Sequence, residues 1–253
     1  MLTNPVKARL RAGETVFGCF TRTTDAALVE FLGLQGWDFL VFDGEHGPLD
    51  TQTLEHLLRA AEARDATALA RVATNAPHRI LQVLDAGARG LHIPMINSTA
   101  EAEAAIQAAK YPPRGSRGLA GVRANAFGTI GTLADYIVQA NAETLTVLHI
   151  ETGRAVDQIE AIAAVPDVDV IFIGTTDLSS DLGIPGQFDH PKLLTAIDRV
   201  AEATQAAGVV LGTILRAPEQ AAIWRSRGAR YFVVTLEAVL GPASRGFLSI
   251  ARA

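Results

Sequence analysis

Short runs of apolar residues recur along the whole chain, and each run is bounded by glycine, proline or aspartate. Several runs are apolar almost throughout instead of alternating with polar residues, which is typical of parallel strands that are covered on both faces. The pattern predicts eight strands, at residues 16–20, 38–43, 67–72, 90–94, 145–151, 168–174, 209–215 and 231–236.

Segments with helical spacing lie between these runs. Residues 51–62 place leucine or alanine at four positions of one helical face. Ser98 precedes the segment 100–109, and Glu101 stands where it would complete a capping box. The predicted helices are 25–34, 51–62, 100–109, 155–164, 193–207 and 219–227.

The alternation of strands and helices predicts the fold. Eight strand–helix units in 253 residues, without a linker rich in proline or serine, match the size of a (β/α)8 TIM barrel. An open doubly wound sheet is the alternative, but the glycine-rich dinucleotide fingerprint is missing after the first strand. We therefore expect an α/β fold, a (β/α)8 TIM barrel formed as one domain over residues 1–253. The connection 111–131 exceeds ordinary loop length, so we expect it to be a lid or an interface element.

Composition narrows the classes of partner. Apolar residues make up 49% of the chain and charged residues 19%, as in globular proteins. The net charge is −5 and no stripe of lysine and arginine is present, so we expect no nucleic-acid partner. Cys19 is the single cysteine, which excludes an intramolecular disulfide and a cysteine-based metal cluster. Without an apolar signal core or a membrane-length apolar run, we expect a cytoplasmic protein with no membrane partner.

Polar side chains gather at the predicted carboxyl ends of the strands, where the active sites of such barrels lie. The stretch "VFDGEHGPLD" is an example, because an apolar strand ends there in two acids and a histidine. The candidates are Asp43, Glu45 and His46 after the second strand, Arg71 after the third, His149 and Glu151 at the fifth and Asp177 after the sixth. Four strands thus contribute to one predicted site.

Glu151 and Asp177 are predicted at neighbouring strand ends, where two carboxylates repel each other unless a cation or a proton lies between them. Oxygen ligands suit Mg²⁺ or Mn²⁺, with positions left open for water and substrate. Two solvated acids, or Asp177 as a helix cap, are the alternative. His149 faces the same side of its strand as Glu151. It could add a nitrogen ligand, contact whatever the ion binds, or be a core histidine bonded to backbone.

Arg71 ends an apolar strand, which is costly unless its guanidinium group has an anion nearby. The planar fork suits a carboxylate or an enolate oxygen, but a salt bridge to Asp43 or Glu45 is an equal alternative. His46 is the natural general base, because histidine side chains titrate near neutral pH. A carboxylate could fix its tautomer, and Asp85 and Asp43 are both candidates that the sequence does not separate.

The motifs "FDGEHGPLD", "ALARV", "GLHIPM", "KYPPRGSRG", "HIETGRA" and "IGTTDLSSDLG" stand in this order along the chain. They resemble the HpcH/HpaI family of class II, metal-dependent pyruvate aldolases over most of the chain. The 4-hydroxy-2-oxoheptanedioate and 2-keto-3-deoxy-sugar-acid aldolase branch is the most similar. The resemblance implies a barrel whose last helix is exchanged between subunits, often in a hexamer built as a trimer of dimers. It also implies one divalent ion per subunit, Mg²⁺ or Mn²⁺, with Co²⁺ or Zn²⁺ as alternatives.

The resemblance assigns roles to individual residues. His46 matches the catalytic base, and Asp85 matches the acid that increases the basicity of this histidine. Arg71 matches the arginine that stabilises the enolate and the developing alkoxide. Glu151 and Asp177 match the two protein ligands of the metal.

The substrate site departs from the family pattern. Thr176 matches the position whose backbone N–H holds the substrate carboxylate, and the neighbouring N–H groups of Gly174 and Thr175 stand at the same possible helix start. His149 replaces a glutamine that contacts substrate in relatives of this branch, and "GTTDLS" replaces "GPADLS". The segment "VVTLEAVL" differs as well. These departures concern the choice of acceptor more than the type of reaction.

We therefore predict a divalent-metal-dependent aldolase that forms or cleaves 4-hydroxy-2-oxo acids. Its partners are the enolate of pyruvate or hydroxypyruvate and an aldehyde acceptor. The predicted strand ends present no lysine, which disfavours a Schiff-base aldolase. The alternatives are decarboxylation of oxaloacetate or citrate-lyase-like cleavage at the same site, and a non-catalytic barrel that binds keto acids.

Overall fold

The computed structural model describes residues 3–253 and contains a closed barrel of eight parallel strands. Their order around the barrel is their order along the chain. The strands are β1 (Val16–Thr21), β2 (Phe39–Asp43), β3 (Thr67–Arg71), β4 (Gly90–Ile93), β5 (Leu145–Ile150), β6 (Val170–Ile173), β7 (Val210–Leu215) and β8 (Ala229–Thr235). The predicted (β/α)8 barrel is confirmed, and each predicted strand end lies within two residues of the observed one.

The barrel closes because β8 pairs with β1, with Val16 opposite Tyr231. Every residue of β2, β4, β5 and β6 is buried, since the barrel interior covers one face and helices cover the other. This two-sided cover explains the unbroken apolar runs in the sequence. It also encloses Cys19 of β1, and burial raises the pKa of its thiol to about 12.

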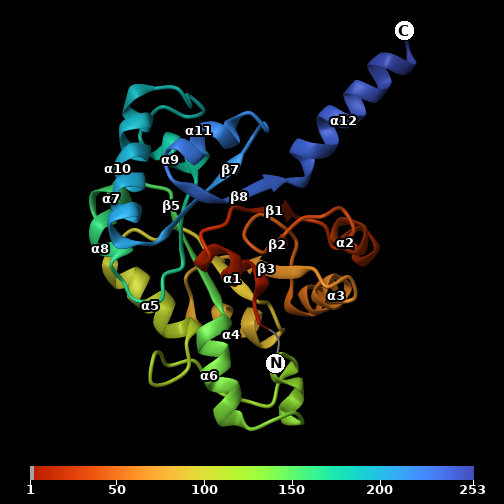
Figure 1. The fold of residues 1–253 in the computed structure, drawn as a ribbon, viewed down its shortest axis with the longest axis vertical. Helices are drawn as coiled ribbons and strands as arrows, with labels where there is room; N and C mark the ends of the chain where they lie inside the picture. Colours follow the sequence, from red (N-terminus) through yellow and green to blue (C-terminus); the bar gives the residue numbers. More distant parts are fainter. Residues whose placement is uncertain (1–2) are drawn as a thin grey trace.

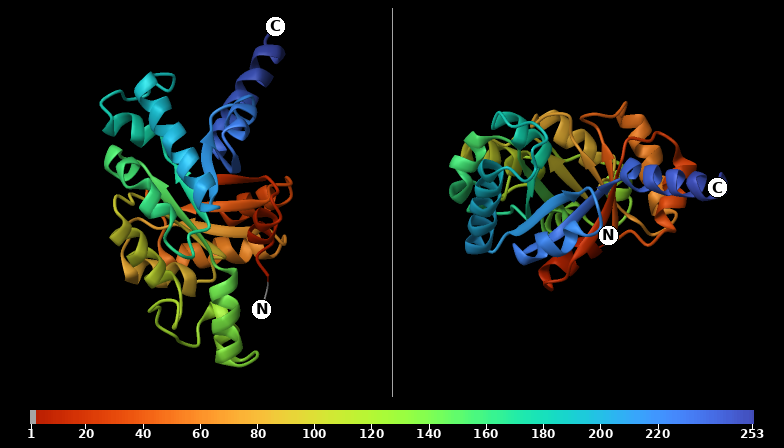
Figure 2. Two further views of the ribbon diagram at one scale, coloured as in Figure 1. Left: turned by 60° about the vertical axis from the view of Figure 1, so that its left-hand side comes forward. Right: turned by 90° about the horizontal axis from the view of Figure 1, so that it is seen from above.

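Helices surround the barrel (Figures 1 and 2). They are α1 (Pro5–Arg11), α2 (Ala26–Gly33), α3 (Thr51–Glu62), α4 (Pro77–Asp85), α5 (Thr99–Ala109), the 3-10 helix η1 (Arg123–Gly128), α6 (Leu133–Glu143), α7 (Gly153–Asp157), α8 (Ile159–Ala163), α9 (Thr175–Asp181), α10 (Pro191–Ala207), α11 (Gln220–Ser226) and α12 (Leu236–Ala251). The predicted helix 155–164 is divided into α7 and α8. None of the predicted helices covers α1, α4, α6, α9 or α12.

Side chains fill the barrel interior, so it is a packed core and not a channel. Gly18 of β1 leaves room for the ring of Phe39, with which a Cβ atom at this position would collide. The Phe39 ring stacks on Tyr231 at a centroid distance of 4.6 Å. Val6 and Leu10 of α1 belong to the same apolar cluster, so α1 closes the end of the barrel where the strands begin.

Two buried lysines stand at this closed end. The Nζ of Lys7 donates to the carbonyl of Thr144 at 2.9 Å and to Oδ2 of Asp169 at 2.8 Å. The Nζ of Lys110 donates to the carbonyls of Asn141 and Thr144 at 2.9 and 3.0 Å. Burial, aided by the charge of Lys7, lowers the pKa of Lys110 to about 7.

The last helix, α12, projects away from the barrel, while α6 extends from the opposite end of the molecule (Figures 1 and 2). The exposed apolar side chains of α12 are Val239, Leu240, Phe247, Leu248 and Ile250. Exposed apolar side chains gathered on one element are typical of interaction sites. Among residues 3–253, no helix combines the length and apolar composition that crossing a bilayer requires.

The buried amine of Lys110 should make stability depend on pH. Its pKa is about 7 in the folded chain against an ordinary 10.5, so the unfolded chain binds more protons between these values. The free energy of unfolding should therefore rise with pH between 7 and 9, by on the order of 1 kcal/mol per pH unit from this group. Urea unfolding at pH 7, 8 and 9 measures the slope, which Lys110→Met should reduce.

Lys192→Met is the matched control, because Lys192 lies exposed on α10 and should leave the slope of the natural chain intact. Equal slopes in the natural chain and Lys110→Met would contradict the expectation.

Candidate active site

A cavity of about 260 Å³ opens at the carboxyl ends of the strands. Its lining residues are Phe20, Arg22, Asp43, His46, Arg71, His149, Glu151, Phe172, Gly174, Thr175, Thr176, Asp177, Ile214, Thr235 and Glu237. Of the site residues predicted from the sequence, two are missing from this lining. Glu45 lies behind it against Arg71, and Asp85 lies elsewhere.

Arg71 is held by two carboxylates. The register of β2 and β3 sets Asp43 opposite Arg71, and Nε and Nη2 of the guanidinium donate to its two oxygens at 2.9 and 2.8 Å. Burial works against the charged form of Asp43, but Arg71 and the backbone N–H groups of His46 and Glu45 hold its pKa below the usual value. The Nη1 atom of Arg71 lies 2.8 Å from Oε2 of Glu45. The predicted salt bridge is therefore present, and the hydrogen bonds to Asp43 use two of the five guanidinium N–H groups.

His46 stands on the loop after β2, and its side chain is 58% exposed. Its backbone N–H donates to Oδ1 of Asp43, so Asp43 positions the loop and not the ring. In the part of the chain that the structure describes, Glu45 is the one carboxylate within 4.0 Å of the imidazole. Burial raises the pKa of Glu45, and the charge of Glu151 adds to this effect.

A chain of buried hydrogen bonds runs from the barrel interior to Glu151. The hydroxyl of Tyr231 lies 2.7 Å from Nε2 of His92, and Nδ1 of His92 lies 2.9 Å from Nε2 of His149. The Nδ1 atom of His149 lies 3.0 Å from Oε1 of Glu151. The ring of His149 also stacks on Phe172.

The carboxylate end determines the direction of these bonds. Ionised Glu151 can only accept, so His149 carries a proton on Nδ1. Burial lowers the pKa of His92 well below its usual range and raises that of Tyr231, so both side chains are neutral. If Tyr231 donates to His92 and His92 donates to His149, every group is satisfied. In the opposite direction the Tyr231 proton would lack an acceptor. Both nitrogens of His149 are thus engaged, and it does not offer a ligand to a metal.

The carboxylate of Glu151 is fixed from both sides. Its Oε2 atom accepts from the backbone N–H of Met95 at 2.9 Å, while His149 donates to Oε1. Burial alone would raise the pKa of Glu151, but His149, the Met95 N–H and Arg71 outweigh it and lower the pKa. Gly174 provides the space, because a Cβ atom there would lie 2.7 Å from Oε1 of Glu151.

The short helix α9 begins at the same place. Gly174 is its N-cap residue, and the first helical hydrogen bond ends on the Gly174 carbonyl. The N–H groups of Thr175, Thr176 and Asp177 precede this bond and have no acceptor within the helix. Such groups suit an anion. Thr175 is held by Nη1 of Arg216, which donates to its hydroxyl at 2.9 Å.

The oxygen donors in this cavity fit a hard divalent cation. Glu151 follows β5 and Asp177 follows β6, so adjacent strands supply two carboxylates to one cavity. No group of three or more His, Cys, Asp or Glu residues among those described is arranged to hold a metal ion. A cation here would therefore have two protein ligands and keep positions open for water and substrate, as Mg²⁺ commonly does.

Asp85 does not reach this cavity, and its predicted contact with His46 does not occur within one chain. It is the last residue of α4, which runs back from the carboxyl end of β3 towards the start of β4. It therefore lies at the opposite end of the barrel. Its Oδ1 atom accepts from Nη2 of Arg117 at 2.6 Å.

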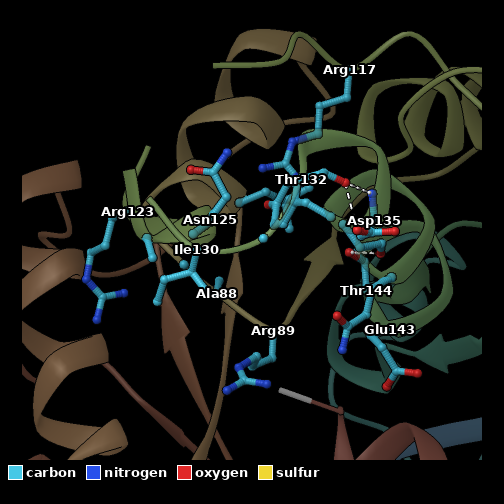
Figure 3. Close-up of a pocket in the computed structure, with 18 of the residues that line it drawn as sticks. Ala88, Arg89, Arg117, Arg123, Asn125, Ile130, Thr132, Asp135, Glu143 and Thr144 are labelled. Atoms are coloured by element: carbon cyan, nitrogen blue, oxygen red, sulfur yellow. Dashed lines mark hydrogen bonds between the residues drawn. The ribbon is translucent and has the colours of Figure 1, made fainter. Parts of the chain in front are cut away.

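Arg117 lines a second pocket, of about 480 Å³, together with Ala88 and Thr144 from the starts of β4 and β5 (Figure 3). The long connection 111–131 contributes η1 and the segment before α6 to this pocket. None of residues 111–131 lines the first cavity. The expectation that this connection forms a lid over that cavity is therefore wrong within one chain. Its role as an interface element stays a prediction.

Several residues of the cavity and of the hydrogen-bond chain were not predicted from the sequence. Arg22 directly follows β1 and Thr235 ends β8, so both stand at strand ends like the predicted site residues. Glu237 is in the first turn of α12 and carries no such signal. His92 and Tyr231 lie 139 positions apart, and nothing in the sequence pairs them.

The three lysines of the chain stand apart from the cavity. Lys7 and Lys110 are bonded at the closed end of the barrel, and Lys192 lies on α10. None of the lining residues is a lysine. A Schiff base with a substrate carbonyl therefore has no nucleophile here.

Two named aldolases are similar to this chain in sequence. The chain is 37% identical over 232 residues to the 5-keto-4-deoxy-D-glucarate aldolase of Shigella boydii serotype 18, covering 91% of this chain and 89% of that protein. It is 34% identical over 240 residues to the 2-keto-3-deoxy-L-rhamnonate aldolase of Escherichia coli O157:H7, covering 95% and 90%.

The crystal structure of an HpcH/HpaI aldolase/citrate lyase family protein from Burkholderia cenocepacia J2315 has the same fold. Its TM-score is 0.93 at 36% identity, covering 99% of this chain and all of that one. Residues 16–239, which include every predicted site residue, match the HpcH/HpaI aldolase/citrate lyase family. This chain belongs to that family.

Proposed function

We propose that the chain is a divalent-metal-dependent aldolase that forms or cleaves 4-hydroxy-2-oxo acids through the enolate of pyruvate or hydroxypyruvate and an aldehyde. The observation that carries the proposal is a single cavity that combines the carboxylates of Glu151 and Asp177, the fixed guanidinium group of Arg71 and the exposed imidazole of His46. The names of the two sequence relatives support keto-deoxy sugar acids as the substrate class.

Glu151 and Asp177 would hold the cation, Mg²⁺ or Mn²⁺, with Co²⁺ and Zn²⁺ as alternatives. When bound, it supplies a Lewis acid that withdraws electrons from the keto group and acidifies the adjacent methyl group. The N–H groups at the start of α9, that of Thr176 among them, hold the substrate carboxylate. His149 keeps Glu151 in its orientation.

Proton transfer falls to His46. In the direction of synthesis, its imidazole removes a proton from the methyl carbon as the enolate forms. The N–H groups of Arg71 that do not donate to Asp43 stabilise the oxygen charge of the enolate, and then the alkoxide after addition to the aldehyde, which takes the proton back from His46. In the direction of cleavage, His46 takes the proton of the 4-hydroxyl group, the bond between C3 and C4 breaks, and the enolate then receives this proton at C3 to form the methyl group of pyruvate.

The proposed enzyme is a homo-oligomer. The exposed apolar side chains of α12 support a helix that packs on a second copy, and the family resemblance implies a hexamer with this helix exchanged. The role of Asp85 as the acid beside His46 would then be fulfilled between subunits. It cannot be fulfilled within one chain.

The reaction is tested with pyruvate in deuterated water. Metal-loaded protein should introduce deuterium into the methyl group, because His46 removes its proton reversibly. With an aldehyde added, it should form the 4-hydroxy-2-oxo acid, which NMR identifies. A chelator should abolish both reactions, and Mg²⁺ or Mn²⁺ should restore them.

Three results would contradict the proposal. Full activity in the presence of chelator would show that the reaction does not require a metal ion. Binding of pyruvate without exchange would indicate the keto-acid-binding barrel. Release of carbon dioxide from oxaloacetate, without any product from an aldehyde, would indicate a decarboxylase.

Gly174→Ala tests whether Glu151 holds the metal. The added methyl group would push the carboxylate out of its position, since it would lie 2.7 Å from Oε1. Displacement of an orienting contact weakens metal binding by about 10- to 100-fold, and isothermal titration with Mn²⁺ measures this loss directly. Gly118→Ala is the control, because a Cβ atom there meets nothing within 4 Å. Equal Mn²⁺ affinity in the two variants would show that Glu151 is not a ligand of the metal.

Mixed oligomers test the placement of Asp85. His46→Asn should lower kcat by about 10²- to 10⁴-fold, and Asp85→Asn should also be impaired. Oligomers that contain both variants, isolated with two affinity tags, should be more active than either parent, because some sites then combine a natural His46 with a natural Asp85. Light scattering gives their size. Hybrids no more active than the parents would rule out action between subunits.

A further inference from the structure

Arg22 is a cation of the cavity to which no role has been assigned. It directly follows β1, and its side chain lines the cavity beside the loop that carries His46. A Cβ atom built on Gly47, the residue after His46, would lie 3.4 Å from Cβ and Cγ of Arg22. The stem of Arg22 therefore runs along the backbone that presents the base.

The partner of Arg22 is easily exchanged. Its Nη2 atom donates to Oε1 of Glu237 at 2.8 Å, but the two side chains are 49% and 57% exposed. Exposed pairs of this kind contribute little to stability, so an anion that enters the cavity can replace Glu237. Arg71, the other arginine of the lining, is held by Asp43 and Glu45 and lacks this freedom.

The strand order places Arg22 across the barrel from the keto-acid site. Glu151, Asp177 and the start of α9 follow β5 and β6, whereas Arg22 and His46 follow β1 and β2. In a closed barrel of eight strands these two pairs lie opposite each other. With His46 as the base, a keto acid held at β5 and β6 would present its reactive carbon towards β2. Arg22 stands beside this position, at the end of β1.

We propose that Arg22 binds a carboxylate on the acceptor aldehyde, so that the preferred acceptors are short aldehydes that carry a carboxylate of their own. The guanidinium fork matches this group in geometry and charge. The inference rests on the proposed aldolase function and assigns a specificity-determining residue to its second half-site.

The test compares two acceptors of equal length, glyoxylate with a carboxylate and glycolaldehyde without one. The measured quantity is the ratio of their kcat/KM values with saturating pyruvate and Mn²⁺. Arg22→Gln should lower the ratio at least 20-fold, chiefly through KM for glyoxylate, and Arg22→Lys should restore part of it. Arg64→Gln is the matched control, since Arg64 forms a similarly exposed pair with Glu30 far from the cavity, and it should keep the ratio.

An unchanged ratio in Arg22→Gln, or an equal loss with both aldehydes, would overturn the inference. Failure of the aldolase function is recognised separately, because the natural protein would then neither exchange deuterium into pyruvate nor form a product with either aldehyde.

Discussion

The hydrogen bonds between β8 and β1 are the interaction on which the rest of the structure depends. They close the sheet, remove its edges and bring the carboxyl ends of eight strands onto one ring. Neighbours on this ring become chemical partners, as Asp43 and Arg71 do across β2 and β3. Residues on strands that are not neighbours, such as His46 after β2 and Glu151 after β5, line one cavity of about 260 Å³.

The ring of strand ends brings charged side chains together in a place where burial disfavours the charged form of each group. Arg71 is half-buried beside two carboxylates, and Glu45 has an oxygen that accepts no hydrogen bond. An arrangement of this kind adds little stability over well-packed apolar side chains. The hydrogen-bond chain from Tyr231 through His92 and His149 to Glu151 likewise places polar groups inside an apolar core. Local conflicts of this kind are expected where function, and not packing, selects the residue.

The sequence predicted the strands and most of the cavity for one physical reason. Two-sided burial turns each strand into an apolar run, and the first polar residues after a run must lie at the open end of the barrel. Arg71, Glu151 and Asp177 were found in this way. The same reasoning fails for a residue whose place depends on the direction of a helix. Asp85 follows no strand, and α4 carries it to the other end. It also fails for His92 and Tyr231, which meet through the closure of the barrel and not through any local pattern.

The burial of Cys19 has a practical consequence for spectroscopy. Thiol reagents attack the thiolate, and this side chain combines a pKa of about 12 with complete enclosure in the wall of β1. A maleimide dye or a nitroxide spin label will therefore not react with the natural chain. A cysteine introduced on the exposed surface of α12 would therefore be a unique attachment point for a label. Fluorescence or electron paramagnetic resonance could then follow how copies of the molecule associate.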